Sequence, residues 1–122
     1  MIVIADTGPL NYLIQINCDS LLQALFSRVI IPQTVWLELS NGAAPRVVRD
    51  WAINLPGWVE VKRASAFDDP DLQNLGNGER EAILLAEELG ANLLLMDERQ
   101  GRAEAARRRM RAMGNARRLG SS

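Results

Sequence analysis

Short apolar runs alternate with helical segments along this chain, and this alternation constrains its fold more than any other feature. Strands are predicted at the apolar runs, which occupy residues 1–5, 28–31, 58–61 and 92–96. Helical patterns, often opened by a proline or a capping residue, fill the intervals between these runs. Strands that alternate with helices indicate an α/β fold with a parallel sheet, here of about four strands.

Three of the predicted helices have ends that can be read from the sequence. Residues 7–9 (Thr-Gly-Pro) are expected to form a turn after the first strand, with the proline suited to the first turn of the next helix. Asn77 is expected to cap a helix over residues 78–89, and Gly90 is expected to end it. A helix rich in Ala and Arg is expected from Glu98 onward.

Two of the predicted strands end directly in an aspartate. The run IVIAD ends at Asp6, and the run LLLMD ends at Asp97. If the two strands are neighbours in a parallel sheet, both carboxylates lie at its carboxyl edge, where ligands bind in folds of this class. Aspartate is also common after strands because it suits turns and caps, so either residue alone would carry little weight. The pair shifts the balance toward a site.

Two further carboxylates occupy unusual places in predicted helices. Glu38 is the only charge in the apolar segment PQTVWLEL. Glu79, in GNGEREAILLAEEL, shares a helix face with Ala82 and Ile83, the face expected to meet the core. A negative charge in a first helical turn is also favoured by the helix dipole, which is the structural alternative for Glu79. Glu81, two residues on, has an intermediate position.

Four carboxylates that converge need a positive charge between them. At about 4 Å, two like charges repel by roughly 4 kcal/mol at an effective dielectric near 20. A divalent cation removes this conflict, and carboxylate oxygens favour Mg²⁺ or Mn²⁺ over Zn²⁺. Such ions activate water and stabilise the charge on a phosphate under attack. The acidic residues therefore predict metal-assisted phosphodiester hydrolysis or another phosphoryl transfer.

The composition excludes several other kinds of active site. The chain has no histidine, which excludes Ser-His-Asp chemistry and the usual His-rich zinc sites. Its single cysteine, Cys18, cannot form an internal disulfide, which fits a reducing compartment. No apolar run approaches the roughly 20 residues of a membrane span, and the N-terminus lacks the features of a signal peptide. A cytoplasmic location without membrane attachment is expected.

The charges are distributed very unevenly along the chain. Residues 1–98 carry 14 acidic and 6 basic side chains, whereas residues 99–122 carry 1 acidic and 8 basic. The basic part can be a solvated helix or frayed end, or an arm that contacts phosphates. Arg99 and Arg102 follow Asp97 closely and can contact a substrate phosphate or pair on the surface.

The acidic residues, taken in order, resemble a known family. The segments IVIADTGPL, VWLEL, GEREAILLA and LLLMDERQGR are similar in order and spacing to those of PIN domains, in the prokaryotic branch related to VapC-like toxin ribonucleases. The resemblance covers about residues 1–106. It implies a three-layer α/β fold and a Mg²⁺- or Mn²⁺-dependent endoribonuclease. Many such proteins are toxins of toxin–antitoxin pairs, form homodimers, act on RNA and are held by an antitoxin protein.

The resemblance also assigns roles to individual residues. The catalytic quartet it implies is Asp6, Glu38, Glu79 and Asp97. Of these it places the metal on Asp6, Asp97 and Glu79. Thr7 matches a hydroxyl that often follows the first aspartate, and Glu81 and Glu98 are neighbours that can substitute or assist.

The C-terminal part departs from the family pattern. After the helix that contains the Gly-Arg pair of the last motif, PIN domains usually continue into a further strand and a final helix. Here the segment RRRMRAMGNARRLGSS has no apolar run typical of a strand. A nuclease domain at 1–106 and a basic tail at 107–122 are therefore expected, with the last strand and helix missing and the end truncated or altered.

Two other functions remain open at this point. The first is a catalytically inactive, truncated PIN-like module that binds a protein partner or RNA. The second is a receiver-like phosphotransfer domain, which would need a lysine near the acidic site. Lys62 is the only lysine in the chain.

Overall fold

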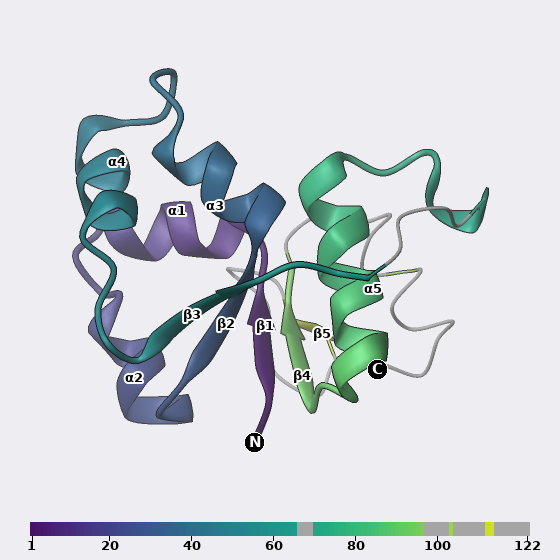
Figure 1. The fold of residues 1–122 in the computed structure, drawn as a ribbon. Coiled ribbons are helices and arrows are strands. Elements are labelled where there is room, and N and C mark those ends of the chain that lie inside the picture. Colours follow the sequence, from purple (N-terminus) through teal and green to yellow (C-terminus); the bar gives the residue numbers. More distant parts are fainter. Residues whose placement is uncertain (66–69, 97–102, 104–111, 114–122) are drawn as a thin grey trace.

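The computed structural model describes residues 1–65, 70–96, 103 and 112–113, which form a parallel sheet with helices on both faces (Figure 1). The strands are β1 (Val3–Ala5), β2 (Val29–Pro32), β3 (Val59–Lys62), β4 (Leu93–Leu95) and β5 (Ala112–Met113). The helices are α1 (Thr7–Gln15), α2 (Ser20–Phe26), α3 (Gln33–Ser40), α4 (Arg46–Ile53) and α5 (Asn77–Leu89), with a 3-10 helix, η1, at Pro70–Leu72. No helix in these residues has the length and apolar character that crossing a membrane requires. The predicted α/β class is confirmed.

The sheet has the strand order β3-β2-β1-β4-β5, and its strands run parallel. The strand β1 is therefore central, with Ile4 aligned with Ile30 of β2 on one side and Leu94 of β4 on the other. Helices α1 to α4 pack on one face of the sheet and α5 packs on the other, which gives three layers (Figure 1). The two strands that precede the candidate site residues Asp6 and Asp97, β1 and β4, are therefore direct neighbours.

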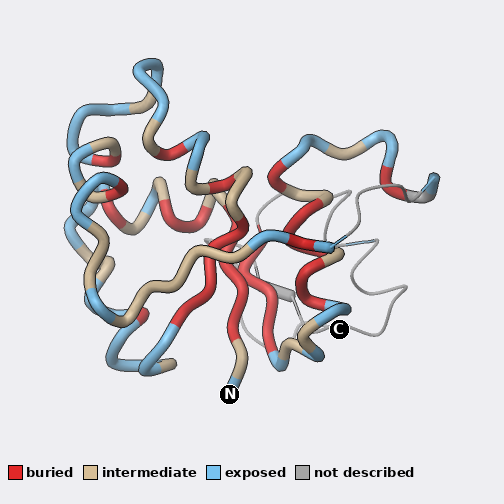
Figure 2. Tube along the Cα trace, viewed as in Figure 1, coloured by how far each residue is buried: buried red, intermediate tan, exposed pale blue. Residues whose placement is uncertain are grey.

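The central strands are buried on both faces, as the red tube in Figure 2 shows. Alternate residues of β1 point to opposite layers, so Val3 and Ala5 join the core under α1 to α4, while Ile4 joins the core under α5. This explains why β1 and β4 read as continuous apolar runs rather than as alternating ones.

Two helix starts differ from the predictions. Helix α1 begins at Thr7, immediately after Asp6, so residues 7–9 are helical rather than a separate turn. Pro9 is accepted there because the first four N–H groups of a helix have no partner within the helix. Helix α5 is preceded by Gly76 and not by Asn77. Its predicted end is confirmed, since Gly90 adopts the left-handed conformation with a φ of 64°.

The predicted absence of a strand in the C-terminal part is wrong. Residues Ala112–Met113 form β5 and pair in parallel with Leu94 and Leu95 of β4. The strand has only two residues, so it is too short to produce the apolar run by which the other strands were predicted. The domain boundary at residue 106 stays a prediction, although β5 lies beyond it. The helix predicted from Glu98 onward falls outside the described residues, apart from the helical Ala103.

Candidate active site

Asp6 lies at the carboxyl end of the central strand, where β1 meets the first turn of α1. Its side chain is buried, and its backbone N–H donates a hydrogen bond to the carbonyl of Leu95 at 2.9 Å. That bond continues the pairing of β1 with β4 by one residue. It fixes Asp6 beside the end of β4, just before the fully buried Met96. Asp97 comes next in the chain and lies outside the described residues.

Three acidic side chains from three elements line one cavity of about 240 Å³ at this edge of the sheet. Asp6 comes from the end of β1, Glu38 from α3 and Glu79 from the first turn of α5. The remaining described residues of this acidic cavity are Thr7, Gly8, Gly76 and Gly78. The structure thus brings together three of the four acidic residues singled out in the sequence.

Gly78 holds the acidic cavity open where α5 approaches α3. A Cβ at this position would stand 2.9 Å from Oε1 of Glu38, 3.2 Å from Cγ2 of Val35 and 3.3 Å from Oδ1 of Asp6. All three distances are shorter than ordinary van der Waals contacts, so a larger residue would push α3 or the carboxylates away. Sequence reasoning did not single out this glycine, although the Gly-Asn-Gly opening of α5 was a visible signal.

Thr7 links the first strand to Glu38. Its hydroxyl donates a hydrogen bond to Oε1 of Glu38. Glu38 is otherwise exposed, so this bond is what holds its carboxylate in the acidic cavity. The hydroxyl that follows the first aspartate is therefore bonded to Glu38.

Glu79 combines a place in the acidic cavity with a structural task. Its Oε1 accepts a hydrogen bond from the backbone N–H of Gly76 at 2.8 Å, which forms one half of a capping box. The residue is only partly buried and does not lie on the core face of α5. The expectation that Glu79 faces the core with Ala82 and Ile83 is therefore wrong. Its place in the first turn of α5, where the helix dipole favours a negative charge, accounts for a carboxylate at this position.

The buried carboxylate of α5 is Glu81, which is 1% exposed. Its Oε1 accepts hydrogen bonds from the N–H of Thr34 at 2.7 Å and from the Thr34 hydroxyl at 2.6 Å, and its Oε2 accepts one from the N–H of Ala64 at 3.0 Å. This Glu81 junction ties α5 to the start of α3 and to the chain just after β3. Glu81 is not among the described residues that line the acidic cavity.

A family model described as a PIN domain matches residues 2–119. The chain belongs to the PIN domain family. PIN domains are generally nucleases and typically use divalent metal ions. A search of curated proteins found no match to the chain.

The oxygen atoms that line the acidic cavity of this PIN domain would suit a hard divalent cation. Asp6, Glu38 and the Thr7 hydroxyl supply oxygen donors in one small cavity, which is the chemistry that Mg²⁺ and Mn²⁺ prefer. Within residues 1–65 and 70–96, no three acidic side chains gather closely enough to hold a metal ion by themselves. Asp97, Glu98, Arg99 and Arg102 lie outside these residues.

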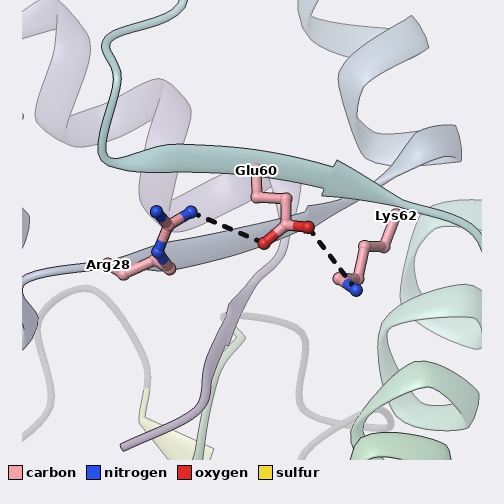
Figure 3. A network of polar contacts seen from close by, with 3 residues as sticks. All are labelled: Arg28, Glu60 and Lys62. Carbon is pink, nitrogen blue, oxygen red and sulfur yellow. Dashed lines mark ion pairs between the residues drawn. The ribbon is translucent and has the colours of Figure 1, made fainter.

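Lys62 has a partner of its own in the PIN domain. Its Nζ lies 3.4 Å from Glu60, which also pairs with Arg28 at 3.5 Å (Figure 3). All three residues lie on β3 or next to the start of β2. The lysine that a receiver-like site would need is therefore engaged on the edge strand, and it is not among the described residues of the acidic cavity.

Proposed function

We propose that this PIN domain is a Mg²⁺- or Mn²⁺-dependent endoribonuclease that hydrolyses RNA phosphodiester bonds. The supporting observation is the convergence of Asp6, Glu38 and Glu79 on one cavity at the carboxyl edge of the sheet. Asp97 would complete the quartet, because its strand β4 is the direct neighbour of β1. Asp6, Asp97 and Glu79 are the proposed metal ligands.

The residues of the acidic cavity suit this chemistry individually. The backbone of Asp6 is fixed beside the central strand, and its side chain is buried, so the carboxylate has little room to move. Glu38 is exposed and is held by Thr7 through Oε1, so it can orient a water molecule and accept its proton. A bound divalent ion would lower the pKa of that water and stabilise the negative charge that develops on the phosphate. Glu79 would leave its cap on Gly76 to join the metal ligands.

The finer parts of the proposal depend on the family resemblance alone. They include a VapC-like toxin role, an antitoxin partner, a homodimer and a cytoplasmic location. Glu98 would assist the acidic quartet, and Arg99 and Arg102 would contact the RNA phosphates. The family match supports the PIN domain without naming a branch.

The proposal is tested by cleavage of single-stranded RNA with Mg²⁺, with Mn²⁺ and with a chelator. Asp6→Asn and Asp97→Asn should each lower kcat by about 100-fold or more, because each removes a negative charge from the metal ligands. Asp50→Asn is the matched control, since Asp50 is exposed on α4 and pairs only weakly with Arg46 at 3.9 Å. It should cleave like the unmodified chain.

Two results would count against an active nuclease. Full cleavage by both Asn variants would show that the acidic cavity is not the site. Absence of cleavage with either metal, together with RNA binding that weakens as salt increases, would instead support the inactive binding module.

A further inference from the structure

A second and larger cavity, of about 450 Å³, lies on the other side of α3. Its walls are mostly apolar and come from α3, α4 and β3. The described residues that line this Trp36 cavity are Gln33, Trp36, Ala52, Ile53, Leu55, Val61, Lys62 and Arg63. Its volume falls in the range of pockets that hold small ligands, about 300–1,000 Å³.

The Trp36 cavity opens at the same edge of the sheet as the acidic cavity. Gln33 directly follows β2, and Arg63 directly follows β3, just as Asp6 directly follows β1. Because these strands are parallel, all three positions lie at the carboxyl edge. Trp36 and Glu38 are two residues apart on α3, so they point to nearly opposite sides of that helix. A helix with its side chains is about 10–12 Å wide, which sets the distance between the two cavities.

Trp36 provides a fixed aromatic wall for this cavity. Its indole N–H donates a hydrogen bond to the carbonyl of Ala52 in α4 at 2.9 Å. The ring is partly buried against the core and also lines the cavity. An aromatic ring held in this way can stack on a nucleobase without an ordering cost.

Arg63 places a positive charge at the rim. It is exposed and follows Val61 by two residues, so in extended chain both side chains lie on the same side. Its neighbour Lys62 is engaged with Glu60 (Figure 3). No ion pair to Arg63 is found among the described residues. A guanidinium in this position suits a phosphate oxygen.

We propose that the Trp36 cavity binds one nucleotide of single-stranded RNA beside the cleavage point, with the base against Trp36 and its phosphate at Arg63. This inference depends on the proposed function for its substrate. An apolar wall next to a cation matches a base joined to a phosphate. An apolar peptide segment would leave Arg63 without a complementary charge.

The inference is tested by RNA binding in the absence of metal, so that cleavage plays no part. The probe is an oligouridine of about ten nucleotides, labelled for fluorescence anisotropy and kept in chelator. Ile53→Glu adds a negative charge to the exposed wall and should weaken binding about 10-fold. Arg63→Ala should weaken binding about 5-fold and lower the slope of log affinity against log salt by about 0.7.

Two matched control variants distinguish the loss of this site from the nonspecific effect of changing the protein's net charge. Leu25→Glu makes the same kind of change at a residue that is 69% exposed on α2, compared with 67% for Ile53. Arg28→Ala removes the same charge as Arg63→Ala but just before β2, at the opposite edge of the sheet. Neither control should change binding by more than about twofold. In cleavage assays, the two test variants should raise KM and leave kcat unchanged.

The possible outcomes distinguish this inference from the proposed function. RNA binding that depends on Ile53 and Arg63, without any cleavage, would support the subsite and end the nuclease proposal. Test variants that bind like the unmodified chain, or no better than their controls, would overturn the subsite even if cleavage persists. Loss of self-association in Ile53→Glu with unchanged RNA binding would show that the cavity is a protein contact, and would also overturn it.

Discussion

The acidic cavity and the Glu81 junction use the same kind of side chain in opposite ways. At the junction, Glu81 is buried and accepts three hydrogen bonds from Thr34 and Ala64, so the chain itself satisfies the carboxylate. In the cavity, Glu38 is exposed and accepts one bond from Thr7. A structural carboxylate therefore differs from one available to a ligand in the number of donors that the protein supplies, and not in residue type.

Replacing Glu38 in the acidic cavity should affect activity far more than stability. Glu38→Gln should lower kcat by about 100-fold, because it removes a charge at the proposed reaction centre. Its free energy of unfolding should change by less than about 0.5 kcal/mol, since the residue is exposed. RNA cleavage and urea unfolding measure the two quantities. Equal losses of activity and stability would remove the distinction between the two regions.

The complementary change is Glu81→Ala. It should lower the free energy of unfolding by about 2–3 kcal/mol, because it leaves the partly buried N–H of Thr34 and the buried N–H of Ala64 without an acceptor. Chemical denaturation measures the loss, and Glu81→Gln is the control that keeps the shape and one acceptor oxygen. Unchanged stability of the alanine variant would show that the junction does not hold α3 and α5 together.

Gly78→Ala tests the contact between the two helices at the acidic cavity. The new Cβ would meet Glu38 and Val35, so the free energy of unfolding should fall by about 1–2 kcal/mol. Gly42→Ala is the matched control, because no heavy atom lies within 4 Å of its Cβ position. A stabilised Gly78→Ala protein would mean that α5 moves away from α3 without cost.

The smallest effect is expected from Thr7→Val. Losing the hydroxyl removes the bond that orients Glu38, which should lower kcat about 5-fold with little change in stability. Thr7→Ser keeps the hydroxyl and should retain full activity in the same assay. A valine variant as active as the serine variant would show that Glu38 needs no orienting group.

Much of the fold could be predicted because the central strands are buried on both sides. The runs around Val3 and Leu94 are continuously apolar, and the helices between the strands carry their own start and stop signals. The edge strand β5 could not be found this way. It consists of Ala112 and Met113 in a basic segment, and its partner is the open side of β4 rather than any local pattern.

The site could be predicted in outline but not in its details. Asp6 and Glu38 were visible as acids at a strand end and in an apolar helix. The burial and hydrogen bonds of Glu81 were not predicted, because its donors lie 47 and 17 residues away in the chain. A signal did exist, since it shares the i, i+3, i+4 spacing of the buried face with Gly78 and Ala82.

Helix α3 is fastened at three points along its short length. Thr34 is bound by Glu81, Trp36 by the carbonyl of Ala52, and Glu38 by Thr7. Because α3 is held at these three points, the distance between the Trp36 cavity and the acidic cavity on its two sides is fixed. If the Trp36 cavity binds a base, the number of nucleotides between that base and the cleaved bond should be the same in all RNA fragments whose ends are mapped.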